Sequence, residues 1–578
     1  MPKPTPCILV LAALWLFVGT LQAHGGQYRG PRTGGAAGNG PRGALGPRTG
    51  GAGNLDINSW QVWWQLNHER YLDAPTTTVT DGDRRSIVMP TLALALGRND
   101  VPHILSASLI ALGKSAVDTP EIDVLGVLRK HLSNSTSEVR EAATLALGLT
   151  GRTDAVADLS GLLTDNKLGR RPVSRSKVND RVRAFAAYAL GILAQRTDSV
   201  DARAMALAAL ISVLERKSNK DPEVLTAVLH GIRILGATKK IGADNKLILE
   251  TAIAALEAHL KRKLKGKFAV AQSNGLTALA YLARHAGAAE QARAVELITN
   301  VLRNRRAESS IHVSTMIAAG QLFRPNHTRE LAILLKHVTK PSDSLVPKFA
   351  MIALGQIGGD TAFEVLRDTF KVGSRDIKPW AALGLGLLGG ERKVPGGIAN
   401  QPQAANRNWR NKAGEVLLAG LKSEKSRNLR GAIAIALGLA KVQSAAKQLS
   451  TIASNRADIN ARLTRVGLAM LDKNVSARQA MAAVGGTGYA SKPQSIGHTK
   501  DAYYLPGLSK TIGAAKKTRT GRANPSTIDY QAAFAAAAMG AIADSQLLSF
   551  GTYVAEGMNY TTRIPTVING QTGILDIF

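Results

Sequence analysis

One pattern of apolar and small residues recurs along most of the chain. Apolar residues stand at relative positions 0, 3, 4, 7 and 8, and glycine follows at position 9. Clear copies span residues 139–148 and 182–191, and other copies end at Gly355 and Gly438. This spacing places the apolar side chains on one face of an α-helix, because the helix completes a turn every 3.6 residues. The pattern therefore predicts a series of similar amphipathic helices.

A second amphipathic stretch separates successive copies, as at residues 202–215 and 440–452. Helical hairpins that resemble one another stack on their neighbours and form a solenoid. The glycine at the end of each copy allows a close crossing with the next helix, or a positive φ at the helix end. We therefore expect an all-α fold, an α-solenoid whose surface carries the function.

The first residues have the features of an exported protein. Residues 1–23 read as a secretory signal peptide, with Lys3 near the start, an apolar core at 7–18 and a cleavage site after Ala23. Residues 24–55 are rich in glycine and arginine and predict a disordered N-terminal tether, because they bury too little apolar surface to offset their ordering entropy. We expect no transmembrane span after processing.

The rest of the chain divides into three predicted segments. Residues 56–484 are assigned to the solenoid, and a helix with Trp60, Trp63 and Trp64 is expected to cap its exposed end. Residues 485–525 are rich in glycine, proline, serine and lysine, and predict a long basic loop. Residues 526–578 are expected to hold the last repeat and a C-terminal tail.

The net charge of the chain indicates which classes of partner it favours. The formal net charge is +31, which favours acidic partners such as nucleic acid, anionic polysaccharide, lipid headgroups or an acidic protein. The sole cysteine, Cys7, falls in the signal segment. The processed chain would therefore lack disulfides, cysteine zinc sites and a cysteine nucleophile.

Two groups of basic residues are the candidate binding site for an anionic partner. The groups consist of Lys261, Arg262, Lys263, Lys265 and Lys267, and of Arg303, Arg305 and Arg306. They occupy similar positions in successive repeats, and turns of successive repeats line up along one edge of a solenoid. We expect them to form one ridge, named here the basic ridge. The alternative is solubility charge at helix C-termini, where lysine and arginine are favourable.

Three short motifs resemble catalytic or cofactor sites but lack the required context. Residues 384–389 read GxGxxG, yet they lie in the register of the helical repeat rather than after a strand. Gly113-Lys114-Ser115 resembles the end of a P-loop without its first glycine, and His68-Glu69 is not followed by the second histidine of HExxH. We therefore predict no catalytic residue, no cofactor and no metal site.

The starts of two repeat helices carry a family resemblance. Residues 137–140 and 180–183 each lead into an alanine-rich helix that ends Ala-Leu-Gly, and these units resemble HEAT repeats over residues 84–480 and again at 531–543. The resemblance implies that these helices line one face of a superhelix. It also implies that an acid and an arginine near each helix start help the repeats to stack. Those residues are Glu138 with Arg140, and Asp180 with Arg183.

Both ends of the chain extend the resemblance. The segment that begins at His24 and the tail at 573–578 are similar to those of exported, functionally uncharacterised bacterial HEAT-repeat proteins. This likeness implies export, to the periplasm, the cell surface or the medium, and implies no activity.

These observations favour a non-catalytic exported scaffold that binds a protein or an anionic envelope polymer. One alternative is a nucleic-acid-binding protein similar to HEAT-like DNA glycosylases, which the charge supports and the signal peptide disfavours. Another is an enzyme similar to HEAT-like chromophore lyases, which requires a pocket of placed polar residues.

Overall fold

The computed structural model describes residues 59–72, 77–98, 100–216, 221–237, 243–339, 341, 343–390, 403–454, 459–472, 476–482, 500–515, 527–546, 550–562 and 574. The expected signal peptide at 1–23 and linker at 24–55 lie outside these residues and stay predictions.

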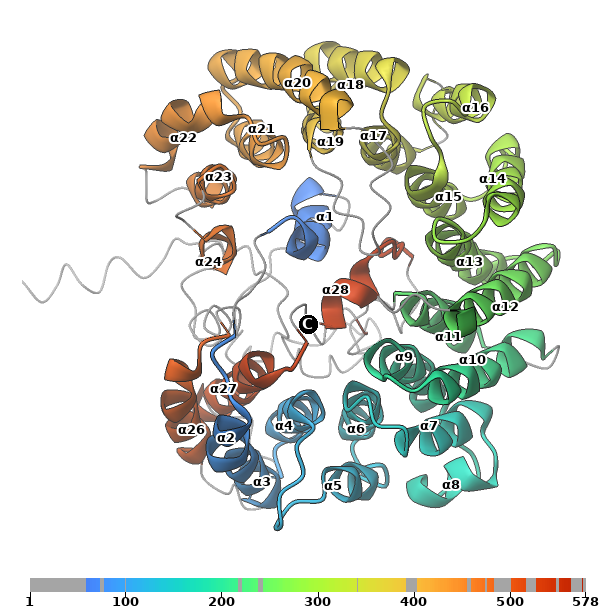
Figure 1. The fold of residues 1–578 in the computed structure, drawn as a ribbon, viewed down its shortest axis with the longest axis vertical. Coiled ribbons are helices and arrows are strands. Elements are labelled where there is room, and N and C mark those ends of the chain that lie inside the picture. The colour runs from blue at the N-terminus through green and yellow to red at the C-terminus, as the bar shows by residue number, and fades with distance from the viewer. Residues whose placement is uncertain are drawn as a thin grey trace, which may run out of the picture.

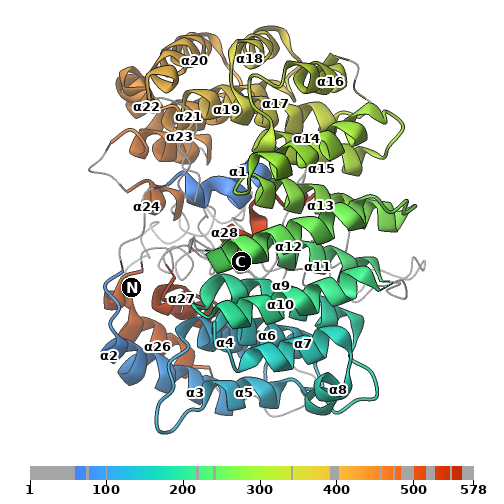
Figure 2. The ribbon, with the colours of Figure 1, turned by 45° about the vertical axis from the view of Figure 1, so that its right-hand side comes forward.

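Two layers of helices form the molecule, and the outer layer packs on the inner layer (Figures 1 and 2). The inner helices are α4 (Pro102–Ser115), α6 (Ser137–Leu149), α9 (Asp180–Arg196), α11 (Pro222–Leu235), α13 (Lys267–Ala283), α15 (Ser309–Leu322), α17 (Leu345–Ile357), α19 (Lys378–Gly389), α21 (Arg427–Leu439) and α23 (Ile459–Ala469). The outer helices are α5 (Val124–His131), α7 (Ala155–Thr164), α10 (Val200–Glu215), α12 (Ala243–Leu260), α14 (Ala288–Arg303), α16 (Thr328–Thr339), α18 (Asp360–Val372), α20 (Gln403–Ser423) and α22 (Ala446–Ala453). Helix α8 (Lys167–Val173) packs beside α7, and α24 (Ala477–Ala482) follows α23. The expected all-α solenoid is confirmed.

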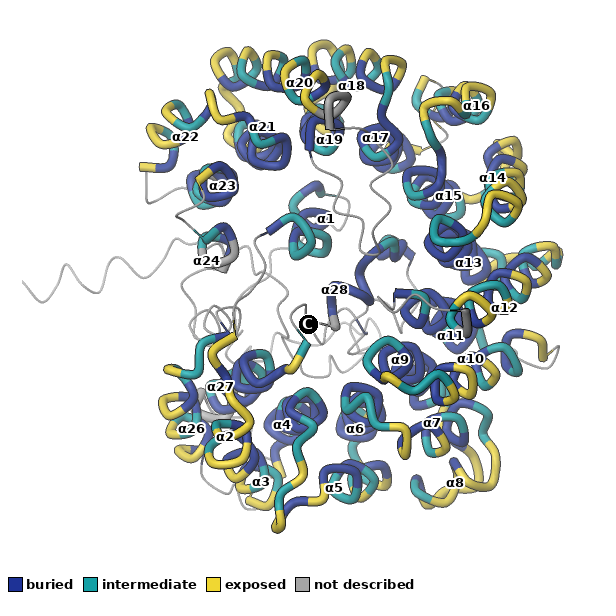
Figure 3. Tube along the Cα trace, viewed as in Figure 1, coloured by how far each residue is buried: buried dark blue, intermediate teal, exposed yellow. Residues whose placement is uncertain are grey.

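Inner helices are buried more completely than the sequence pattern predicts. In α9, every residue from Ala184 to Ala194 is buried, and in α11 every residue from Val224 to Leu235 is buried (Figure 3). The pattern predicts one apolar stripe, whereas an inner helix such as α9 meets two inner neighbours, α6 and α11, and two outer helices, α7 and α10. Small side chains such as alanine allow this close packing on several sides.

Close crossings between inner helices explain the repeated glycines. A Cβ atom on Gly148 would lie 2.4 Å from the Ala189 carbonyl oxygen, and one on Gly355 would lie 2.3 Å from that of Gly384. The GxGxxG segment therefore serves helix packing within α19, and Gly386 lies against Ala436. Gly97 differs, because a Cβ there would meet nothing within 4 Å.

The arc of helices curves round until its ends meet. Helix α27 (Thr527–Ala543), near the C-terminus, packs on α4. Helix α26 (Leu505–Gly513) packs on α3 (Met89–Arg98) and on η3 (Arg84–Val88), and α2 (Asp81–Asp83) adjoins η3. Figure 1 shows the resulting ring. The sequence predicts a superhelix but not this closure, which requires the rotation between repeats to accumulate to nearly a full turn.

The segment expected to be a long basic loop at 485–525 is partly helical. Its residues 500–515 contain η6 (Ala502–Tyr504) and α26, whose Leu505, Leu508 and Ile512 are buried at helical spacing. Lys500 is buried, and its Nζ donates a hydrogen bond to the Asp544 carbonyl oxygen at 3.1 Å. The expected loop is wrong for these residues. Pro506 does not interrupt a helix here, because it stands in the first turn of α26, where the helix needs no amide donor.

Two short helices lie inside the ring (Figures 1 and 2). They are α1 (Trp60–Asn67), followed by η2 (His68–Arg70), and α28 (Phe550–Ala555). Trp60 donates a hydrogen bond from Nε1 to Asn428 Oδ1 at 2.8 Å, and the Trp63 ring lies 6.5 Å from that of Trp380. The tryptophan-rich helix therefore lies inside the ring, against α19 and α21, rather than covering an end of the solenoid as expected.

Candidate functional site

The basic ridge lies in two turns between outer and inner helices. Residues 261–266 join α12 to α13, and residues 304–308 join α14 to α15. The exposed members are Lys261, Lys263, Lys265, Lys267, Arg303, Arg305 and Arg306. Arg262 is half-buried, because its guanidinium donates a hydrogen bond to the Leu214 carbonyl oxygen at 3.1 Å. Most of the expected ridge is therefore available to solvent.

Hydrogen bonds between neighbouring repeats align these turns along one edge. Arg216 donates to the Thr164 carbonyl oxygen at 3.3 Å, and Arg262 donates to that of Leu214 at the end of α10. Further along, His337 Nε2 lies 2.8 Å from the Leu302 carbonyl oxygen. Since each bond reaches the C-terminus of an adjacent outer helix, the C-terminal ends of successive outer helices follow one another along the edge.

Other basic residues on this edge are partly neutralised. Arg170 pairs with Asp165 at 2.9 Å, and Lys177 pairs with Asp180 at 3.4 Å. The run from 261 to 267 contains no acid in its sequence. The ridge is thus the part of the edge with the densest positive charge.

Stacking between repeats uses other residues than the resemblance implies. Asp180 and Arg183 pair with each other at 2.9 Å within α9. Arg140 is buried and donates to the Asn134 and Ser135 carbonyl oxygens of its own turn. The ion pair that joins α6 to α9 is Glu141 with Arg181 at 2.9 Å.

Glu138, the other residue with an implied stacking role, is placed in a poorly solvated position. Burial, with the neighbouring charge of Glu141, raises the pKa of Glu138 to about 9. The group is therefore protonated at neutral pH and does not serve as an anionic partner for an arginine of the next repeat.

A C-terminal segment, residues 550–562, lies along the inner layer. Arg233 of α11 donates hydrogen bonds to the carbonyl oxygens of Val554 and Glu556. Asn559 Nδ2 donates to the Ser310 carbonyl oxygen at 2.7 Å and to Ser314 Oγ at 2.9 Å. These contacts cover part of the inner face of the ring.

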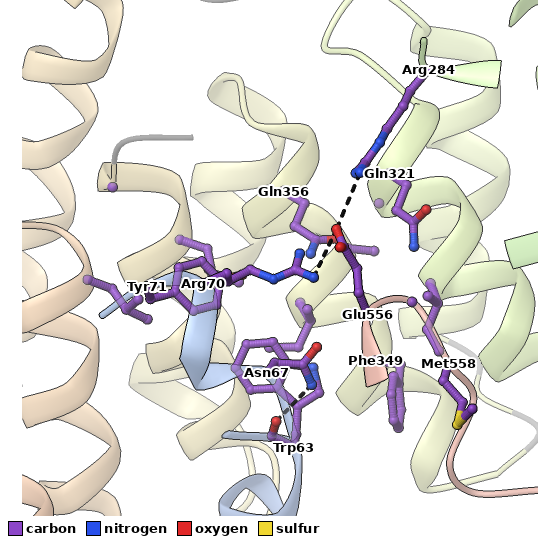
Figure 4. A pocket seen from close by; sticks show the side chains of 18 of the residues that line it. Trp63, Asn67, Arg70, Tyr71, Arg284, Gln321, Phe349, Gln356, Glu556 and Met558 are labelled. Carbon is purple, nitrogen blue, oxygen red and sulfur yellow. Dashed lines mark hydrogen bonds and ion pairs between the residues drawn. The ribbon is translucent and has the colours of Figure 1, made fainter. Parts of the chain in front are cut away.

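Two arginines meet one carboxylate at the centre of the ring (Figure 4). Glu556 Oε1 lies 2.9 Å from Arg70 Nη2 and 3.3 Å from Arg284 Nη2. Burial acts to raise the pKa of Glu556, but the charges of Arg70, Arg284 and Arg233 outweigh it and hold that pKa below its usual value. The carboxylate is therefore ionised at neutral pH.

A cavity of about 150 Å³ adjoins this group. Its lining comes from η2 and α1, from the inner helices α15 and α17, and from the C-terminal segment; it includes Trp63, Arg70, Arg284, Gln321, Phe349 and Glu556 (Figure 4). No pattern in the sequence indicates this site. Its residues are far apart along the chain and share no spacing or motif, so only the folded ring brings them together.

The chemical motifs that the sequence analysis set aside are structural in this fold. His68 Nδ1 lies 2.7 Å from the Gln65 carbonyl oxygen, within the first helical segment. Within the described part of the chain, no group of three or more histidine, cysteine, aspartate or glutamate side chains is placed to hold a metal ion. No helix among those residues is both long and apolar enough to cross a bilayer.

Comparison with known proteins gives likenesses among solved structures. No family model matches the chain, and no curated protein matches its sequence. A crystal structure of importin beta is 13% identical, with a TM-score of 0.43 over 79% of this chain and 63% of that one. The CpcE–CpcF complex of phycocyanin lyase from Nostoc sp. PCC7120 is 20% identical, with a TM-score of 0.31 over 52% of this chain and 97% of that one. An engineered protein is 17% identical, with a TM-score of 0.30 over 68% of this chain and 99% of that one.

Proposed function

We propose that this protein is a non-catalytic, exported scaffold that binds an anionic partner, either an acidic protein or an anionic envelope polymer, through the basic ridge. The observation that carries the proposal is the exposure of seven ridge cations on two adjacent turns of one edge. The inner face of the ring is a weaker candidate, because α1 and the C-terminal segment occupy its centre.

The charge of the ridge should make its binding depend on the salt concentration and on the number of cations. Exposed charges attract an anionic polymer from a distance of roughly 10 Å at 0.1 M salt, and added salt shortens that range. Each exposed ion pair contributes only about 0.2–1 kcal/mol, so that binding requires several cations together. Four exposed lysines at one turn, Lys261, Lys263, Lys265 and Lys267, meet this requirement.

A charge-matched pair of variants tests the proposal. The ridge variant replaces Lys261, Arg262, Lys263, Lys265 and Lys267 with serine. The control variant replaces five other exposed cations with serine, namely Arg98, Lys246, Arg329, Lys447 and Lys510. Three of these lie at the start of outer helices, at the opposite edge of the ring. Both variants lose the same formal charge.

The measurement is the Kd for polyglutamate and for alginate at low and at raised salt. We expect the ridge variant to bind about tenfold or more weakly than the control, and the difference to shrink as salt rises. Equal affinities of the two variants at low salt would exclude the ridge. A clear preference of the wild-type protein for duplex DNA over both polymers would favour the nucleic-acid alternative.

A further inference from the structure

The cavity at the centre of the ring has more positive than negative charge around it. Arg70 and Arg284 share the single carboxylate of Glu556. A third guanidinium in the lining, that of Arg324, donates hydrogen bonds to the Leu322 and Phe323 carbonyl oxygens. Three guanidinium groups and one carboxylate thus belong to the lining of the cavity.

Neutral groups complete the polar part of the cavity. His285 also lines it, and burial, with the charge of Arg284, lowers the pKa of this histidine to about 4, so it is uncharged at neutral pH. A buried charge that lacks a counter-charge is costly, since the surrounding protein solvates it less well than water does. An anion in the cavity would balance the excess.

Two buried polar atoms in the lining lack a hydrogen-bond partner among the described residues. They are Arg70 Nε and Gln321 Oε1. Buried polar atoms in folded proteins are nearly always hydrogen-bonded, so each such atom indicates a missing partner. An oxyanion suits the N–H of Arg70 Nε as that partner, whereas Gln321 Oε1 is itself an acceptor and requires a donor.

Apolar side chains make up another part of the lining. They belong to Ile317, Phe349, Ile352, Leu387 and Met558. The volume, about 150 Å³, matches that of engineered apolar cavities that bind benzene. A ligand with a small apolar body and one anionic end would satisfy both parts of the lining.

We propose that the cavity binds a small organic carboxylate about the size of benzoate, with its carboxylate at Arg70 and Arg284 and its apolar body against Phe349 and Ile352. This site is independent of the basic ridge, because the two share no residue. Because α1 and the C-terminal segment lie inside the ring, such a ligand would link both of them to the inner layer.

Benzoate is the probe, and benzyl alcohol is its uncharged counterpart of similar shape. Calorimetric titration of the full chain should show benzoate binding and no comparable binding of benzyl alcohol or of inorganic phosphate. Arg284→Gln should weaken benzoate binding at least about tenfold, because it removes one charge-assisted hydrogen bond. This variant leaves Glu556 paired with Arg70, which favours folding.

A second variant fills the cavity without changing any charge. Leu387 is half-buried in the lining, and Leu387→Trp should abolish benzoate binding. Leu168→Trp, at an exposed position of α8, is the matched control and should bind benzoate as the wild type does. The proposal is overturned if the wild-type protein binds no benzoate, if phosphate binds as tightly as benzoate, or if Leu387→Trp binds benzoate as well as Leu168→Trp does.

Discussion

Gly540 of α27 lies directly against Ala111 of α4, so that a Cβ atom on Gly540 would come within 2.5 Å of the Ala111 Cα atom. The two residues belong to opposite ends of the helical array. Their contact is therefore the point where the ring closes.

Gly540→Val should open the ring. The added side chain would meet the backbone of α4 and prevent the present crossing of α27 and α4. Small-angle scattering should show a larger radius of gyration, while the far-ultraviolet circular dichroism stays helical. Gly513→Val is the control, since a Cβ there meets nothing within 4 Å. An unchanged radius for Gly540→Val would contradict the importance of this contact.

Glu556 should make the protein sensitive to acid. Its pKa is lowered in the folded state from an ordinary value of 4.5. Its contribution to stability is therefore complete above that value and is lost as the pH falls through the lower pKa of the folded state. Glu556→Gln should reduce the free energy of unfolding at pH 7 by about 3–5 kcal/mol, because Arg70 and Arg284 lose their shared anion.

The measurement for Glu556 is urea unfolding at several pH values between 7 and 3. Stability of the variant should vary less with pH below 4.5 than that of the wild type. Glu364→Gln, at an exposed position of α18, should leave the pH profile unchanged. Parallel profiles for wild type and Glu556→Gln would show that this carboxylate does not control acid unfolding.

Glu138→Gln should stabilise the protein at neutral pH. Burial, with the charge of Glu141, raises the pKa of Glu138 from 4.5 to about 9. Between these values the folded state keeps a proton that the unfolded state releases, so stability falls as pH rises. An amide removes this cost, and we expect a gain of about 1–3 kcal/mol at pH 7. Denaturant unfolding at pH 5 and pH 8 checks this, because the gain should be larger at pH 8; a loss of stability at both would refute it.

Gly148→Ala should destabilise the solenoid although alanine is the better helix former. The new Cβ atom would lie 2.4 Å from the Ala189 carbonyl oxygen, which outweighs a propensity gain of about 1 kcal/mol. We expect a net loss of about 1–3 kcal/mol in thermal or urea unfolding. Gly97→Ala, in open space within α3, should be neutral or slightly stabilising. If Gly148→Ala and Gly97→Ala change the stability equally, the close crossing is not the reason that glycine is required at position 148.

The local pattern was sufficient to predict the helices and their contacts with immediate neighbours. Apolar spacing around Val139 and Val182 depends only on the helical period, and the glycines at 148 and 191 mark crossings between adjacent helices. These features lie within one or two repeats, so they are visible in a short window of sequence. The exposure of most of the basic ridge follows in the same way from its place in two turns.

The long-range arrangement could not be predicted from that window. Closure of the ring depends on small rotations that add up over all the repeats, and no single repeat contains that sum. The position of Trp60 inside the ring, and the meeting of Arg70 and Arg284 at Glu556, depend in turn on closure. The sequence by itself thus determined which helices form and how neighbours pack, because those interactions are local. Only the tertiary structure decided that the array closes on itself and builds a charged cavity at its centre, because those contacts join segments from opposite ends of the chain.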